Sequence, residues 1–375
     1  MQRLLHFALD SDTSGYFPQL ARWHDREQYQ MYFATLGPMA PWLEEYMHSQ
    51  GVSTFSCHCR SRKSYPQGLW RFVQILRKVR IDILHAHLFD PSVVGLTAGI
   101  LAGIKLRVMT RHYSDYHTRI QKHWHVKLDQ WCNWAAHSII AVSEHTKKHL
   151  VEVEHTRPKK ITTVLNGIDF DRVQLSSSDA PKRLREEYLQ GESGFLLLVV
   201  GRLHSDKGYE FLFPALPKLR QLVTQPVTLL IAGSGTYLDR YQEMVRSLGW
   251  SDRVHFLGYR KDVCDLMAAA DLIVLPSVAE AFGLVLAEAL YLGTPVLATR
   301  TGGIPEVIDD GVDGVLVPPA DSQALAEGIA RMLNDSDLRQ RLAGAGRDKV
   351  REKFGFETMV REYEKVYSRS LSDSE

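Results

Sequence analysis

The chain lacks a long hydrophobic run, a cysteine framework and an excess of charge of one sign. Its longest apolar stretch, residues 93–104, contains three glycines and is too short to cross a bilayer. The four cysteines include no two matched pairs of the kind that hold zinc, so we expect reduced thiols in a cytoplasmic protein. A formal net charge of +1 argues against a general nucleic-acid partner.

The first strand-like run, residues 3–9, is not followed by the Gly-x-Gly-x-x-Gly sequence of dinucleotide-binding proteins, which argues against a dehydrogenase. The loop after it contains only one glycine, Gly15, that could approach a phosphate closely. Asp10 and Asp12 in this loop form an Asp-x-Asp pair, a metal-binding pattern in other folds, and would repel a phosphate unless they cap the next helix. No neighbouring residue supports a metal site, so we interpret the pair as a chance match and expect no metal.

Strand-like and helix-like runs alternate along all 375 residues, which is typical of parallel α/β units and long enough for two domains. Polar residues accumulate from Asp169 to Gly194. We therefore expect a first domain over 1–175, a linker over 176–194 and a second domain over 195–353, each with a doubly wound sheet. The expected strands are 3–9, 28–36, 52–57, 81–86, 106–111, 138–142 and 160–165, then 195–200, 227–232, 254–257, 271–275 and 295–298.

Two glutamates, Glu280 and Glu288, flank the expected start of a helix in the second domain. Residues 271–275 read as a buried strand, and Glu280 lies in the loop that follows it, where open α/β sheets bind ligands. Gly283 lies at the start of the helix, whose free amides can bind an anion such as a phosphate. Glu288 comes about two turns later. A nucleotide-sugar has hydroxyl groups at both ends and a diphosphate between them, which suits this arrangement.

A second loop of the same domain carries two cations close to a helix start. Arg202 and Lys207 follow the expected strand 195–200, and positive side chains beside unpaired amides can neutralise a diphosphate. Gly233, Gly258, Gly302 and Gly303 all follow expected strands as well, so several loops would expose backbone at one rim of the sheet.

These residues together resemble the retaining glycosyltransferases of family 4, which have the GT-B fold. The resemblance rests on Gly201-Arg202…Lys207-Gly208, Glu280–Glu288, Thr301-Gly302-Gly303-Ile304-Pro305-Glu306 and Asp313-Gly314…Val317-Pro318-Pro319. The first half matches more loosely, through Asp82–His87, Val142-Ser143-Glu144 and Asn166-Gly167-Ile168-Asp169. It implies two Rossmann-like domains that face each other across a cleft, with a C-terminal helix, 354–375, packed back on the first domain.

The resemblance also implies roles for the matching residues. Arg202 and Lys207 would hold the donor diphosphate, Glu280 the donor sugar and Glu288 the ribose hydroxyls. Gly302 and Gly303 would line the phosphate, and His112 is similar to a histidine near the transferred sugar. The usual glycine-rich loop after the first strand is reduced here to Gly15.

The expected function is retaining transfer of a sugar, for which a UDP-linked hexose is the commonest donor, without a metal or other cofactor. The acceptor would be a saccharide or lipid-linked molecule in cell-envelope or exopolysaccharide synthesis. Two alternatives remain open: a nucleotide-sugar 2-epimerase on the same fold and a non-catalytic carbohydrate-binding protein. Residues 46–81 carry seven Lys or Arg and no Asp or Glu, and the apolar side chains of an expected helix, 66–79, lie among them. This pattern allows a peripheral contact with an anionic membrane on its inner face.

Overall fold

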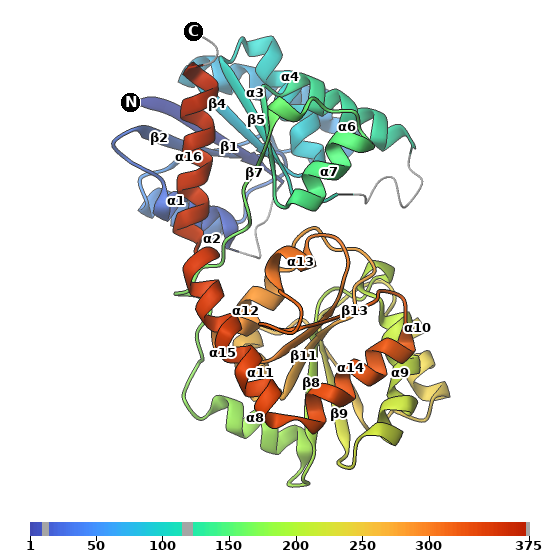
Figure 1. Ribbon diagram of the computed structural model, residues 1–375. Coiled ribbons are helices and arrows are strands. Elements are labelled where there is room, and N and C mark those ends of the chain that lie inside the picture. Colours follow the sequence, from blue (N-terminus) through green and yellow to red (C-terminus); the bar gives the residue numbers. More distant parts are fainter. Residues whose placement is uncertain (10–14, 115–122, 373–375) are drawn as a thin grey trace. The chain divides into compact units, whose positions relative to one another are not determined.

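The computed structural model describes residues 1–9, 15–114 and 123–372, which form two compact units (Figure 1). The first unit contains Met1–Asn166 and Phe356–Glu375, and the second contains Gly167–Gly355. The Asp10 and Asp12 pattern lies outside the described residues. No helix within the described ranges is both long and apolar enough to span a membrane.

The first unit contains a parallel sheet of seven strands in the order β3-β2-β1-β4-β5-β6-β7. Helices cover both faces, so the central strands β1, β4 and β5 are almost continuously buried, as in other two-sided parallel sheets. The strands are β1 (Gln2–Ala8), β2 (Tyr29–Thr35), β3 (Ser53–Ser56), β4 (Ile83–His87), β5 (Leu106–Arg111), β6 (Ser138–Ala141) and β7 (Ile161–Thr163). The described helices are α1 (Tyr16–Trp23), α2 (Pro41–Ser49), α3 (Tyr65–Val79), α4 (Phe89–Ala102), α6 (His123–Ala135), α7 (Glu144–Glu152) and α16 (Phe356–Ser372).

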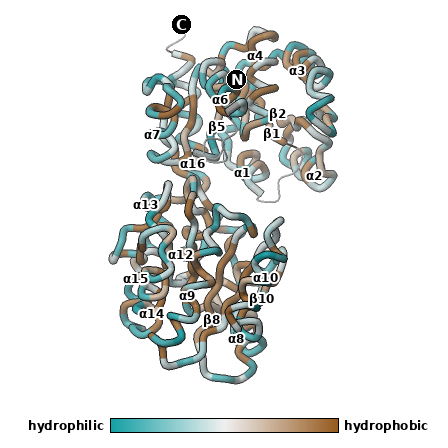
Figure 2. Tube along the Cα trace, turned by 90° about the vertical axis from the view of Figure 1, so that its right-hand side faces the viewer, coloured by the Kyte–Doolittle hydropathy of each residue, from teal (hydrophilic) through white to brown (hydrophobic). Residues whose placement is uncertain are grey.

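The second unit has a parallel sheet of six strands in the order β10-β9-β8-β11-β12-β13. Its strands are β8 (Phe195–Val200), β9 (Val227–Ala232), β10 (Val254–Gly258), β11 (Leu272–Leu275), β12 (Val296–Thr299) and β13 (Val315–Val317). Its helices are α8 (Ala180–Leu189), α9 (Tyr209–Leu222), α10 (Leu238–Ser247), α11 (Val263–Ala269), α12 (Leu284–Leu292), α13 (Ile304–Val307), α14 (Ser322–Asn334) and α15 (Ser336–Lys353). Hydrophobic residues run along β8 in the interior of this unit (Figure 2).

The chain returns to the first unit through α16, the red helix of Figure 1. This helix buries one face in the same hydrophobic core as α1, α2 and the sheet. The buried residues of α16 are Phe356, Met359, Val360, Tyr363, Val366 and Tyr367. The first unit is therefore built from two segments that are far apart in the sequence.

The α/β architecture is confirmed, and all twelve expected strands are present. The structure differs from the sequence prediction at two places in the second unit. Residues 176–194, expected as a linker, contain α8, which buries Ala180, Leu184 and Leu189. The unit begins earlier, at Gly167. The short edge strand β13 was not expected, since three residues give too little pattern to predict one.

Candidate functional site

The residues predicted to bind a donor in the second unit follow adjacent strands of its sheet. Strands β8, β11 and β12 are neighbours and run parallel, so their carboxyl ends meet at one edge. Ligands bind at this edge in open α/β sheets. Lys207, Glu280 and Gly302 lie in or beside the three loops that leave these strand ends.

Lys207 and Glu280 form an ion pair between two of these loops. The Lys207 Nζ donates to Glu280 Oε2 at 2.6 Å, and the two side chains are only 15% and 17% exposed. The Ser277 hydroxyl donates to the same carboxylate oxygen at 3.4 Å. Such charge-assisted bonds are stronger than neutral ones and fix the direction of both side chains. The sequence placed the two residues in separate roles, whereas the structure makes them neighbours.

Backbone contacts hold the three loops against one another. The amide of Val278 donates to the Asp206 carbonyl at 2.9 Å, which joins the loops after β8 and β11. The amide of Gly303 donates to the Glu280 carbonyl at 3.0 Å, which joins the loops after β11 and β12. At Gly302 the backbone has φ +55°, and a Cβ would lie 1.7 Å from the Glu280 carbonyl oxygen. Glycine at 302 is thus needed for the position of Glu280.

Arg202 is the exposed cation of the site. Its side chain is 71% exposed, and one guanidinium nitrogen lies 3.5 Å from Asp206 Oδ2. The other oxygen of the buried Asp206 carboxylate lies 2.7 Å from His204 Nδ1. An exposed ion pair of this kind constrains a side chain weakly. Arg202 can therefore turn toward an anionic ligand, whereas Lys207 is already fixed.

Glu288 lies on α12 and is a partly buried residue. The helix begins after Gly283, whose φ of 99° is a left-handed conformation that favours glycine. Burial raises the pKa of Glu288 from 4.5 to about 7, and the nearby Arg172 acts in the opposite direction. A carboxyl group whose pKa lies near neutrality costs free energy when it ionises, unless a ligand donates hydrogen bonds to it.

Gly233 and Gly258 lie on the other side of β8, at the ends of β9 and β10. The amide of Gly233 donates to the Gly258 carbonyl at 2.8 Å. A Cβ at Gly233 would lie 1.9 Å from the Gly201 carbonyl oxygen, whereas one at Gly258 would meet nothing within 4 Å. Gly233 thus shapes the base of the loop that carries Arg202 and Lys207.

Two predicted residues, Gly15 and His112, belong to the first unit. Gly15 precedes α1 with φ 72°. His112 follows β5, and its Nε2 lies 3.2 Å from Nδ1 of His87. Burial lowers the pKa of His112 to about 4, so its ring is neutral at physiological pH.

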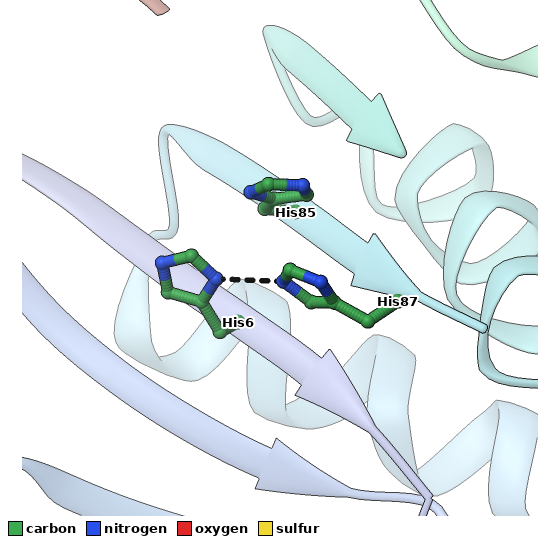
Figure 3. Close-up of side chains that lie close together, drawn as sticks. All are labelled: His6, His85 and His87. Atoms are coloured by element: carbon green, nitrogen blue, oxygen red, sulfur yellow. Dashed lines mark hydrogen bonds between the residues drawn. The ribbon is translucent and has the colours of Figure 1, made fainter. Parts of the chain in front are cut away.

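Within the part of the chain that the structure describes, one cluster could hold a metal ion: His6, His85 and His87. All three are buried, and the close-up in Figure 3 shows their rings on two neighbouring strands, β1 and β4. Nδ1 of His6 lies 2.9 Å from Nε2 of His87. Both ring nitrogens of His85 contact hydroxyl groups, Tyr367 at 2.6 Å and Thr110 at 2.7 Å.

Sequence reasoning missed three residues that support the predicted ones: Asp206, Arg172 and His6. Asp206 could have been suspected because it stands between two predicted cations. His6 had a clearer signal, since His85 and His87 alternate onto one face of a strand and His6 is the register partner of His85. Arg172 had no signal, because its approach to Glu288 depends on how the chain enters the second unit.

Comparisons with known proteins agree with this geometry. The family model described as Glycosyltransferase Family 4 matches residues 16–172, and the model described as Glycosyl transferases group 1 matches residues 182–349. N-acetyl-alpha-D-glucosaminyl L-malate synthase of Bacillus anthracis is 30% identical over 81% of this chain and 78% of its own length. An uncharacterized glycosyltransferase of Methanocaldococcus jannaschii is 33% identical over a match that covers 62% of this chain and 60% of that relative's length.

Solved structures share the fold. The crystal structure of Anabaena HepE in complex with UDP and glucose matches 98% of this chain and 100% of its own with a TM-score of 0.84, at 22% sequence identity. Two parallel α/β units, the loops after β8, β11 and β12 and the two family matches lead to one assignment. The chain belongs to the family 4 glycosyltransferases, group 1, and has the GT-B fold.

Proposed function

We propose that the protein transfers a hexose from a UDP-sugar to a saccharide or lipid-linked acceptor, with retention of the anomeric configuration. The observation that carries the proposal is the ion pair between Lys207 and Glu280 at the strand ends of the second unit. The HepE structure was solved with UDP and glucose, which supports UDP-glucose as the first donor to test. The proposed setting is cell-envelope or exopolysaccharide synthesis in the cytoplasm.

In this proposal, Lys207 and Arg202 neutralise the diphosphate as the sugar–phosphate bond breaks. Charge that develops in a transition state is stabilised best by groups that are already in position, and the pair with Glu280 holds Lys207 in place. Glu280 in turn orients the sugar, while Glu288 accepts hydrogen bonds from the ribose hydroxyls. The backbone at Gly302 and Gly303 approaches the phosphate.

The donor side of the proposal needs no metal, because two cations and helix-end amides can supply the charge neutralisation. We expect full activity after treatment with EDTA. Loss of activity that magnesium or manganese restores would contradict this part of the proposal.

Kinetics of three variants test the division of roles. Glu288→Gln should mainly raise the KM for the donor, because the ribose hydroxyls change little between ground and transition states. Lys207→Ala should lower kcat by about a hundredfold or more, the scale found when an oxyanion-stabilising donor is removed. Glu280→Gln should behave like Lys207→Ala, since it orients the reacting sugar and holds Lys207. The exposed Glu352 on α15 offers a matched control, Glu352→Gln. A wild-type kcat in Glu280→Gln would refute the proposed roles.

A 2-epimerase and a carbohydrate-binding protein are the competing functions. Incubation with UDP-sugar alone separates them: an epimerase converts the free sugar nucleotide, and a binding protein leaves it intact. We expect slow hydrolysis to UDP without acceptor and faster UDP release when an acceptor is added.

The structure of α3 changes which residues can make the proposed membrane contact. Phe72, Val73 and Leu76, which suggested an interfacial helix, are buried in the core of the first unit. Trp70 is 59% exposed, and cations such as Lys78 lie on the same helix. We propose that this exposed aromatic and the basic residues make the contact with anionic lipid.

A further inference from the structure

The first unit contains a row of three histidines that contact one another ring to ring. Nδ1 of His6 lies 2.9 Å from Nε2 of His87, and Nδ1 of His87 lies 3.2 Å from Nε2 of His112. Each contact joins the Nδ1 of one ring to the Nε2 of the next. Figure 3 shows the first of these bonds, between β1 and β4.

All three rings are neutral at physiological pH. Burial lowers the pKa of His6 to about 3 and that of His112 to about 4, and it places the pKa of His87 well below its ordinary value. A neutral imidazole has one N–H donor and one acceptor nitrogen. A hydrogen bond between two neutral rings therefore needs a donor on one side and a lone pair on the other.

This pairing restricts the tautomers of the whole row. If His6 donates from Nδ1, then His87 accepts at Nε2, carries its proton on Nδ1 and donates to Nε2 of His112. If His112 donates from Nε2 instead, each ring carries its proton on Nε2. A mixed row would place two donors or two lone pairs against each other inside the protein, which is costly for buried polar groups.

We propose that His6, His87 and His112 form one hydrogen-bonded chain in which all three rings carry the same tautomer. His6 and His87 are thus positioning residues that decide whether His112 presents a donor or an acceptor at Nδ1. The nitrogen Nδ1 of His112 is the one left for a ligand, because Nε2 faces His87. The link to sugar transfer rests on the proposed function of His112, but the tautomer rule does not.

Burial of the row prevents its two hydrogen bonds from reversing their donor and acceptor roles. Reversal moves one proton across each of the two hydrogen bonds, releases one proton at Nδ1 of His112 and takes one up at Nε2 of His6. His6 is 2% exposed and His87 is fully buried, so solvent has poor access to the inner end. The state of His112 is therefore set by residues that do not touch the ligand.

His6 and His87 also belong to the cluster with His85 that meets the distance condition for a metal site, but the bonds of this cluster favour the row of hydrogen-bonded histidines. Both ring nitrogens of His85 contact hydroxyls, and both ring nitrogens of His87 contact histidines. A metal would have to replace several of these bonds.

Long-range ¹H–¹⁵N spectra of the histidine-labelled full chain test the tautomer rule, because protonated and unprotonated ring nitrogens give separate signals. His6→Phe, His87→Phe and His112→Phe assign the three rings among the 16 histidines. We expect a proton on the same nitrogen of all three. Different tautomers among the three rings, a doubly protonated ring, or stoichiometric zinc bound to the cluster would overturn the proposal.

Kinetics then test the effect on His112. His87→Phe should lower kcat by about tenfold, equivalent to about 1.4 kcal/mol, with little change in the donor KM. His87→Asn keeps a polar atom at the Nδ1 position and should recover part of the loss. His85→Phe is the matched control: His85 is equally buried and its ring packs on those of His6 and His87, but its nitrogens contact Tyr367 and Thr110, so the tautomer of His112 should stay unchanged. Unaltered His112 signals in His87→Phe would refute the coupling.

The two arms separate this proposal from the proposed function. If the three tautomers agree but His112→Phe keeps wild-type kinetics, the proposed role of His112 in transfer is wrong, and the hydrogen-bonded row of histidines still holds. If the tautomers disagree, the proposed row of hydrogen-bonded histidines is wrong, whatever the kinetics show.

Discussion

The raised pKa of Glu288 predicts that a residue proposed to bind the donor destabilises the free protein. Glu288→Gln keeps the size and polarity of the side chain but cannot ionise. Because burial raises the pKa of Glu288 from 4.5 to about 7, the folded and unfolded chains bind different numbers of protons between these values. At ~1.4 kcal/mol per pKa unit, ionising the carboxyl in the native protein costs about 3.5 kcal/mol more than in the unfolded chain.

The sign of the pH effect follows from linkage. Below the unfolded-state pKa of 4.5, the Glu288 carboxyl is protonated in both states, so it does not lower the free energy of unfolding. As pH rises to about 7 the unfolded chain ionises first, so the free energy of unfolding falls. At about pH 8.5 the loss is complete, and Glu288→Gln should be more stable than wild type by about 3.5 kcal/mol. Near pH 4 the two proteins should be about equally stable.

Hydrogen exchange of β8 and β11 peptides in increasing urea measures the stability of the second unit separately. Glu352→Gln, an exposed glutamate on α15, controls for the loss of one surface charge. The stability difference between wild type and Glu288→Gln should grow with pH, whereas that for the control should stay small. A constant difference from about pH 4 to 8.5 would refute the reasoning about Glu288.

Three further predictions concern the loops, α16 and α3. Gly302→Ala should lower kcat at least tenfold, because its Cβ would lie 1.7 Å from the Glu280 carbonyl oxygen; Gly344→Ala, which meets nothing within 4 Å, should keep wild-type kinetics. Deletion of residues 355–375 should remove hydrogen-exchange protection from the first unit, and unchanged protection would contradict the packing of α16. Flotation with anionic vesicles should recover the protein in a salt-sensitive way and less of Trp70→Ser; equal recovery with neutral vesicles would rule out the electrostatic contact.

The sequence predicted the strands and the loops of the site well because both depend on local patterns. Runs such as Phe195–Val200 are apolar throughout, and the loops after them carry glycines and charges at strand ends. The same reasoning placed Lys207 and Glu280 on one edge, since adjacent parallel strands present their carboxyl ends together. Their 2.6 Å contact was beyond the sequence, because it depends on the rotamers of both side chains.

Other features depend on long-range packing that a pattern does not contain. Burial raises the pKa of Glu288, and Arg172, which is 288 − 172 = 116 positions away in the sequence, lowers it. The row from His6 to His112 depends on the order β1-β4-β5, which alternation of strands and helices does not determine. The α8 helix was missed because a serine-rich stretch precedes it and hides a short apolar period.

The discontinuous first unit affects the order in which the protein can fold during synthesis. The second unit, Gly167–Gly355, is continuous and can complete its core as soon as it leaves the ribosome. The first unit emerges earlier but lacks α16 until about 190 more residues have been made, which takes roughly 10 to 40 s at 5–20 residues per second. During that time the surface later covered by Tyr363 and Tyr367 is open to solvent. We expect the nascent first unit to be a chaperone client, because the helix that completes its core is synthesised only after the whole second unit.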